Sequence, residues 1–165
     1  MKFTKDEVIG VAFSKLKPKG DEIFADVGAG SGAVTEFFYP YVRKVYAVEI
    51  DKNICENLRE KFKGNGKVEV LNIDGKEFFE SYECDIAFIG GTKSLEEMIE
   101  VCNAKKVVIS AARVEVAVKA LECLKKKKAF EEIVIVNISK SYDLAGGTAF
   151  KNLNPVFLVV GCFTG

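Results

Sequence analysis

Acidic side chains end three apolar runs of the chain, and a glycine-rich turn follows the first run. The acids are Asp26, Glu49 and Asp74, and the turn is Gly28-Ala29-Gly30-Ser31-Gly32. Glycine adopts positive φ without strain, and it lets a ligand approach the backbone more closely than a Cβ would allow. A strand that ends in such a turn and continues into a helix predicts a nucleotide-type pocket at the carboxyl end of a sheet.

The glycine turn by itself leaves the ligand open. Residues 28–33 satisfy the dinucleotide pattern G-x-G-x-x-G/A, and Glu49 lies near the distance expected of a ribose-binding acid, so NAD is one candidate. Asp26 argues against a diphosphate, because its negative charge would repel one; it would instead hold the turn or a cationic group of the ligand. Asp74 would accept a hydrogen bond from an exocyclic amine, or begin a turn with Gly75. Three acids favour S-adenosylmethionine, which has an ammonium, a sulfonium and ribose hydroxyls but no phosphate.

Strands that alternate with helices must position these groups. Apolar periodicity predicts strands at residues 22–27, 45–49, 68–73, 85–89 and 107–111. Thr4 and Glu7 form a capping box that predicts the start of the first helix. Two final apolar segments, 132–139 and 155–161, have no helix between them. The pattern predicts one α/β domain over residues 1–165, with a mainly parallel sheet covered on both faces and an antiparallel hairpin at one edge.

Composition excludes several kinds of site and partner. The formal net charge is zero, so no global field favours nucleic acid. The absence of His removes the usual neutral-pH base and the commonest zinc ligand, and no metal site is expected. Five cysteines without a C-x-x-C pair indicate reduced, mostly buried thiols. No signal peptide or bilayer-spanning run is present, so we expect a cytoplasmic protein with no membrane partner.

Several segments occur in the order found in one known family. They are residues 4–8, 26–32, 45–49, 85–91 and 154–156. This series resembles the cobalt-precorrin C-15 methyltransferase (decarboxylating) family of anaerobic cobalamin biosynthesis, the CbiT type, and is similar to the C-terminal half of CobL. The more specific parts are Gly90-Gly91 and Asn154-Pro155-Val156. The resemblance implies a Rossmann-like class I S-adenosylmethionine-dependent methyltransferase fold with a mainly parallel seven-stranded sheet.

The resemblance also implies site residues. Cofactor contacts are expected at Thr4, Gly28, Ala29, Gly30, Ser31, Gly32, Glu49 and Gly75, and their charge adds Asp26 and Asp74. Substrate contacts are expected at Gly90 and Gly91. Lys93, Arg113 and Lys140 are candidate partners for substrate carboxylates, because they follow strand ends or lie in the late hairpin. Two segments depart from the family pattern, residues 92–94 and the glycine-containing loop 142–150.

The reaction implied by the resemblance is methylation of C-15 of cobalt-precorrin-6B with decarboxylation of its C-12 acetate. The methyl group would pass to an electron-rich carbon that needs no deprotonation, so the lack of His is no obstacle, and no catalytic acid or base is assigned. Cobalt arrives with the substrate. The family implies a homotetramer, with the apolar edge hairpin as an interface. Two alternatives are an RNA methyltransferase of the same fold and a NAD- or nucleotide-binding module.

Overall fold

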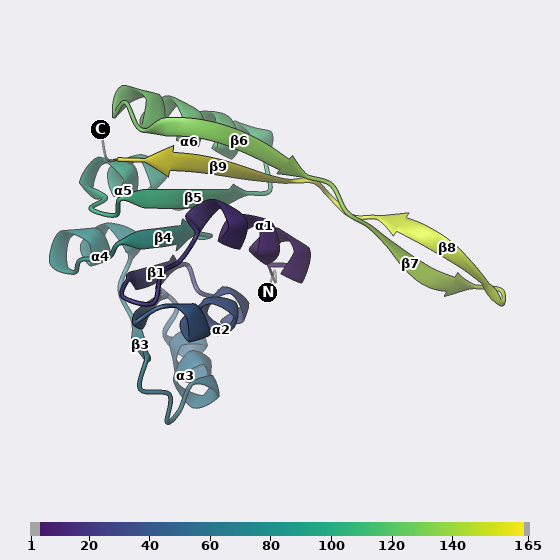
Figure 1. Cartoon of the computed structure of the whole chain (residues 1–165), viewed down its shortest axis with the longest axis horizontal. Helices are drawn as coiled ribbons and strands as arrows, with labels where there is room; N and C mark the ends of the chain where they lie inside the picture. The colour runs from purple at the N-terminus through teal and green to yellow at the C-terminus, as the bar shows by residue number, and fades with distance from the viewer. Residues whose placement is uncertain (1–3, 164–165) are drawn as a thin grey trace.

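A seven-stranded mixed sheet forms the centre of the molecule, and the computed structural model describes residues 4–163 of the chain (Figure 1). The strand order is β3-β2-β1-β4-β5-β9-β6. The strands are β1 (Ile23–Val27), β2 (Lys44–Val48), β3 (Val68–Leu71), β4 (Ile86–Ile89), β5 (Lys106–Ala111), β6 (Phe130–Val136) and β9 (Val156–Cys162). The first five strands are parallel, and β9 is antiparallel to both β5 and β6. The predicted parallel sheet and antiparallel edge pair are confirmed.

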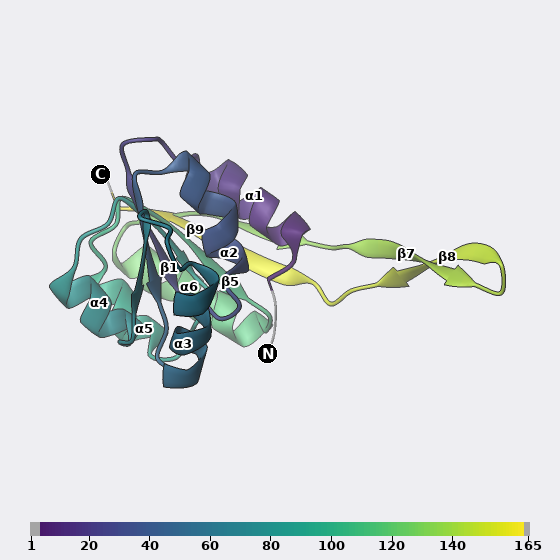
Figure 2. The same cartoon turned by 90° about the horizontal axis from the view of Figure 1, so that it is seen from below.

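Helices cover both faces of this sheet. They are α1 (Asp6–Leu16), α2 (Ala33–Phe38), α3 (Lys52–Lys61), α4 (Gly75–Ser81), α5 (Leu95–Val101) and α6 (Val114–Lys126), with a 3-10 turn η1 (Tyr39–Tyr41) after α2. Figure 2 shows α1 and α2 on one side and α4 and α5 on the other. Strand β4 is buried along its whole length, because both of its faces pack against helices.

Two large hydrophobic cores, one on each side of the sheet, fix most of these helices, and a third, smaller cluster that includes Ala47 and Leu58 fixes α3. Val8, Val34 and Phe38 of α1 and α2 pack with Phe24 of β1 on one side. On the other side, side chains of α4, α5 and α6 pack on strand residues that include Val27. The strand sequences explain the arrangement, since neighbouring residues of a strand point to opposite faces.

The start of α1 differs from the prediction. The helix begins at Asp6, Lys5 is its N-cap, and no side chain caps it. The capping box between Thr4 and Glu7 is therefore wrong. Glu7 makes an ion pair with Lys140, at 2.9 Å, and Thr4 is not the N-cap residue.

A two-stranded arm replaces the predicted loop 142–150. Strands β7 (Ser139–Leu144) and β8 (Gly147–Asn152) pair with each other and project away from the main sheet (Figures 1 and 2). Ala145 and Gly146 both have positive φ, at 49° and 80°, which suits a two-residue hairpin turn. The loop prediction was wrong because the arm has no buried face, so its sequence lacks the apolar alternation of a packed strand.

The environment of the cysteines and the lengths of the helices bear on the expectations from composition. Cys55, Cys84 and Cys123 are buried, which agrees with the expectation that most of the thiols are buried. Burial raises the pKa of the Cys102 thiol to about 11. Among the described residues, every helix is too short or too polar to cross a membrane.

Candidate functional site

The glycine turn has the backbone geometry that its sequence predicts, but a different reason for its glycines. Gly28, Gly30 and Gly32 have φ of 82°, 52° and 82°. A Cβ on Gly28 would collide with the backbone nitrogen of Gly91. A Cβ on Gly32 would lie 2.9 Å from the side chains of Leu58 and Phe62. At these two positions the missing Cβ therefore makes room for the protein itself, whereas the sequence pattern had suggested room for a ligand.

The Gly90-Gly91 pair forms the wall beside this turn. The backbone N–H groups of Gly90 and Gly91 both donate to the carbonyl of Val27, at 2.8 and 3.1 Å. These bonds bring the ends of β1 and β4 together, and a Cβ on Gly91 would lie 3.2 Å from Gly28 Cα. The pair thus has a structural role in the fold, while its contact with substrate stays a prediction.

Glu49 follows β2 and faces the turn. Its Oε1 accepts the N–H of Gly30 at 3.1 Å, and its Oε2 accepts the N–H of Asp51 at 2.9 Å. The residue is 9% exposed. Each carboxylate oxygen has a further lone pair, so Glu49 can hold the turn and still accept a hydrogen bond from a ligand hydroxyl.

Asp26 lies beneath the turn, in β1. It is 1% exposed, and its Oδ2 accepts the N–H and the hydroxyl of Thr35, at 3.1 and 2.7 Å. Burial raises the pKa of Asp26 to about 6, against the opposing effect of the Thr35 hydrogen bonds. Of the two roles that its sequence position allowed, the contacts support the first: Asp26 holds α2 and the turn. It does not line either cavity among the described residues.

Asp74 and Gly75 begin α4. Asp74 is the N-cap, and its Oδ1 accepts the N–H of Glu77 at 2.8 Å. A Cβ on Gly75 would collide with Met98 and crowd Val27, so this glycine permits close helix packing. Both residues also line a cavity, so the capping role leaves a cofactor contact open.

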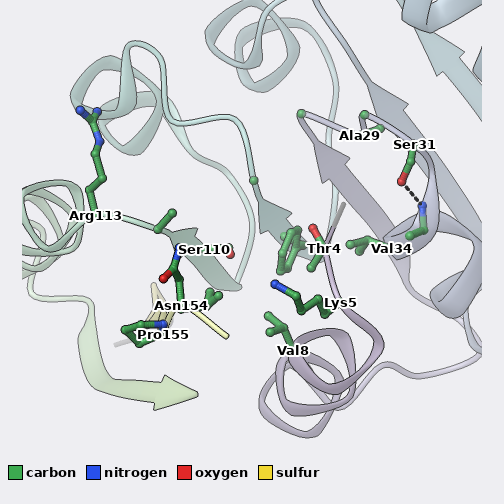
Figure 3. Close-up of a pocket in the computed structure, with 17 residues that line it drawn as sticks. Thr4, Lys5, Val8, Ala29, Ser31, Val34, Ser110, Arg113, Asn154 and Pro155 are labelled. Carbon is green, nitrogen blue, oxygen red and sulfur yellow. Dashed lines mark hydrogen bonds between the residues drawn. The ribbon is translucent and has the colours of Figure 1, made fainter. Parts of the chain in front are cut away.

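Two neighbouring cavities lie at the carboxyl edge of the parallel strands. The smaller, of about 290 Å³, is lined by Glu49, Ile50, Asp74, Gly75, Lys93 and Met98 among others. The larger, of about 840 Å³, is shown in Figure 3. Gly28 lines both cavities, and Gly91 and Gly90 line the smaller and the larger respectively. The contact between Gly28 and Gly91 is therefore the partition between the two.

Five segments far apart in the sequence line the larger cavity. They are the start of α1 with Thr4, Lys5 and Val8; the turn with Ala29, Gly30 and Ser31; the end of β4 with Phe88 and Gly90; the end of β5 with Ser110, Ala112 and Arg113; and Asn154, Pro155 and Val156 before and at the start of β9. Because β9 runs antiparallel to β5, its first residues reach the same edge at which β5 ends. The segment 154–156 thus joins the site through topology.

The predicted cations are distributed differently from expectation. Lys93 lines the smaller cavity. Arg113 lines the larger one, but Figure 3 shows its guanidinium directed away from the other labelled residues. Lys140 lies on β7, where it pairs with Glu7, and it lines neither cavity in the described part of the chain. The residue that sequence reasoning missed is Lys5, whose ammonium points into the larger cavity in Figure 3.

The fold and the site together define a protein class. A mixed sheet with an antiparallel β9, a glycine turn after β1 and an acid after β2 form the Rossmann-like class I S-adenosylmethionine-dependent methyltransferase fold. Within this class, the model of the precorrin methyltransferase domain matches residues 1–161. The chain belongs to that family, and the resemblance seen in the sequence is confirmed.

Individual relatives agree with the family assignment. A protein of Archaeoglobus fulgidus named "Probable cobalt-precorrin-6B C(15)-methyltransferase (decarboxylating)" is 58% identical over 160 residues, covering 97% of each chain. A protein of the same name from Methanosarcina acetivorans is 36% identical over 169 residues, covering 96% of this chain and 92% of its own. The crystal structure of precorrin 8w decarboxylase from Methanobacterium thermoautotrophicum has a TM-score of 0.90 and 26% identity, covering 98% of this chain and 92% of that one.

Proposed function

We propose that the chain, as one domain, methylates C-15 of cobalt-precorrin-6B with S-adenosylmethionine and removes the carboxyl group of the C-12 acetate. The observation that carries this proposal is the pair of cavities that meet at Gly28, in a chain whose residues 1–161 match the precorrin methyltransferase domain. Methyl transfer needs a pocket for the donor next to a pocket for the acceptor, and the two cavities adjoin at Gly28.

The smaller cavity fits the adenosine part of the cofactor. Glu49 has lone pairs for ribose hydroxyls, and Asp74 has a second carboxylate oxygen for an exocyclic amine. Val48, Ile73 and Met98 add apolar surface for the base. When bound, the cofactor supplies an electrophilic methyl group on a sulfonium. Thr4, Ala29, Gly30 and Ser31, on the larger cavity, are the proposed contacts of its amino-acid end.

The protein's own residues contribute positioning and exclusion of water. Asp26 and Glu49 fix the glycine turn through its backbone N–H groups and through α2. The larger cavity falls within the range of ligand pockets, and apolar side chains that include Val8, Phe88 and Val156 line it. Such a surface aligns a flat macrocycle and removes water from the reacting acetate, which favours its loss as carbon dioxide.

Incubation with cobalt-precorrin-6B and S-adenosylmethionine, followed by mass spectrometry, tests the proposal. The expected product has gained one methyl group and lost carbon dioxide. A product with the methyl group alone would remove the decarboxylation half. Separate calorimetric titrations with S-adenosylmethionine and NAD test the cofactor, and tighter binding of NAD would contradict the methyltransferase assignment.

We also propose that four copies assemble through the arm. Tyr142 and Leu144 lie on one face of the arm, and Phe150, which pairs with Ser141, lies on the other. The three side chains are 46%, 56% and 68% exposed, so one copy leaves apolar groups on both faces in water. Sedimentation velocity is expected to give a tetramer, and deletion of residues 139–152 with a short glycine linker is expected to give a smaller species. A tetramer that persists without the arm would contradict this interface.

A further inference from the structure

The larger cavity has a cation that faces its interior and pairs with no side chain of residues 4–163. Of its lining residues, Lys5 and Arg113 are the cations, and Figure 3 shows the Arg113 guanidinium directed away while the Lys5 ammonium points across the cavity toward Ser110 and Asn154. Among the described residues, the Lys5 ammonium makes no hydrogen bond or ion pair. An unpaired cation in a half-closed cavity attracts a ligand anion.

From this placement we propose that Lys5 binds a carboxylate side chain that the tetrapyrrole keeps through the reaction, and so sets the orientation of the substrate. The inference rests on the proposed function, since it takes a polycarboxylate macrocycle as the occupant. It names the recognition group of that site, a role for which the sequence had pointed to Lys93, Arg113 and Lys140.

The backbone of Lys5 is held firmly enough for this role. Lys5 is the N-cap of α1, and its carbonyl accepts the N–H of Ile9 at 2.9 Å. The next turn carries Val8 and Ile9, each 1% exposed in the core beside the sheet. The Cα of Lys5 therefore has a fixed position at the cavity rim, and the ammonium reaches inward from it.

The arm engages a carboxylate close to Lys5 in the sequence. Glu7 lies two residues after Lys5, and its Oε1 instead accepts from the Lys140 ammonium at 2.9 Å. That hydrogen bond is the main cause of the lowered pKa of Glu7, and the charge of Lys5 is a smaller one. Because the Glu7 carboxylate is paired with Lys140, the Lys5 ammonium remains available to bind a substrate carboxylate. Lys140 thus influences the site from outside it.

The chemistry decides which carboxylate Lys5 holds. Loss of carbon dioxide breaks the bond between the methylene carbon of the acetate and its carboxylate carbon. The electron pair of that bond, with its negative charge, passes into the macrocycle, and carbon dioxide departs as a neutral molecule. An ammonium bound to that carboxylate stabilises the charged ground state more than the departing neutral group, which slows the step. The leaving acetate is therefore better placed against apolar lining such as Val8, Val34 and Phe88, and a retained carboxylate against Lys5.

Lys5→Met, which keeps the length of the side chain without its charge, tests the inference in the full-length protein. The KM for cobalt-precorrin-6B is expected to rise about 10- to 100-fold, the range for a hydrogen bond to a charged group, with kcat changed less than about threefold. Lys5→Arg is expected to restore most of the affinity. The matched control is Lys17→Met, which removes one exposed cation just after the other end of α1. The Kd of S-adenosylmethionine and the melting temperature should be unchanged in all three variants.

Each contrary result has a defined meaning. An unchanged KM in Lys5→Met overturns the contact. A change in the ratio of decarboxylated to methylated product places Lys5 on the leaving acetate, which overturns the assignment to a retained carboxylate. If the wild-type protein produces no methylated tetrapyrrole, the proposed function fails; equilibrium titration of cobalt-precorrin-6B against wild type and Lys5→Met then still decides, and equal Kd values overturn the role of Lys5.

Discussion

Replacement of Asp26 by asparagine is expected to change how the free energy of unfolding depends on pH. Burial raises the pKa of Asp26 from 3.8 to about 6 in the folded protein. The folded state therefore binds this proton more tightly than the unfolded chain does. The stabilisation from Asp26 is fully present below about pH 3.8 and is lost as the pH rises through about 6.

The size of the effect follows from the shift. A pKa raised by about 2 units corresponds to about 3 kcal/mol, at 1.36 kcal/mol per unit. The asparagine side chain of the variant does not titrate, and all other ionisable groups are common to both proteins. The difference in unfolding free energy, wild type minus Asp26→Asn, is expected to fall by about 3 kcal/mol between about pH 3.5 and about pH 7.5.

Urea unfolding followed by circular dichroism at steps of half a pH unit measures this difference. Asp21→Asn, at an exposed carboxylate, is the control for loss of one acidic charge. If the difference in unfolding free energy stays constant with pH, burial is not the dominant influence on the pKa of Asp26 and the reasoning is refuted. A difference that grows with pH would show that the two hydrogen bonds from Thr35 outweigh desolvation. Thr35→Val removes the 2.7 Å hydroxyl bond and is expected to steepen the loss of stability toward neutral pH.

Further predictions concern the turn and its acid. Glu49→Ala is expected to weaken binding of S-adenosylmethionine by about 1–3 kcal/mol in calorimetry, the cost of lost hydrogen bonds to a charged group; equal affinities would remove Glu49 from the site. Gly28→Ala is expected to lower the midpoint of urea unfolding and weaken cofactor binding, because a Cβ there meets Gly91 and φ is 82°. Gly10→Ala, in α1 with no atom within 4 Å of the added Cβ, is the opposite case and is expected to stabilise by about 0.5–1 kcal/mol. If both alanine variants behave alike, the contact between Gly28 and Gly91 does not constrain the turn.

Local patterns in the sequence were enough to predict the sheet and the acidic residues at the carboxyl ends of its strands. The apolar runs around Phe24, Val45 and Phe88 predict buried parallel strands, because a strand covered on both faces is apolar throughout. Positive φ in the glycine turn follows from the absence of Cβ. Glu49 lies at the carboxyl edge since parallel strands all end there.

Local sequence patterns did not predict the start of α1, the arm or helix α4. Glu7, assigned with Thr4 to a capping box, makes an ion pair with Lys140, which lies far along the chain on the arm. The arm has neither a buried face nor a hydrophobic pattern, so its pairing depends on the turn at Ala145 and Gly146. Helix α4 was not predicted. The sequence of Asp74 and Gly75 is compatible with a turn as well as with a helix start, and only the hydrogen bond from the Glu77 N–H to Asp74 identifies a helix N-cap.

The sequence by itself determined an α/β protein with a glycine turn, three acids at strand ends and a family resemblance that the comparisons confirm. Tertiary structure alone decided what those residues face. It set Gly28 against Gly91, placed Asp26 under the turn with Thr35, and directed the Lys5 ammonium into the cavity while Lys140 held Glu7. The physical reason is that backbone preference and hydrophobic period act between near neighbours along the chain. A partner is chosen only when packing brings together residues that lie far apart in sequence.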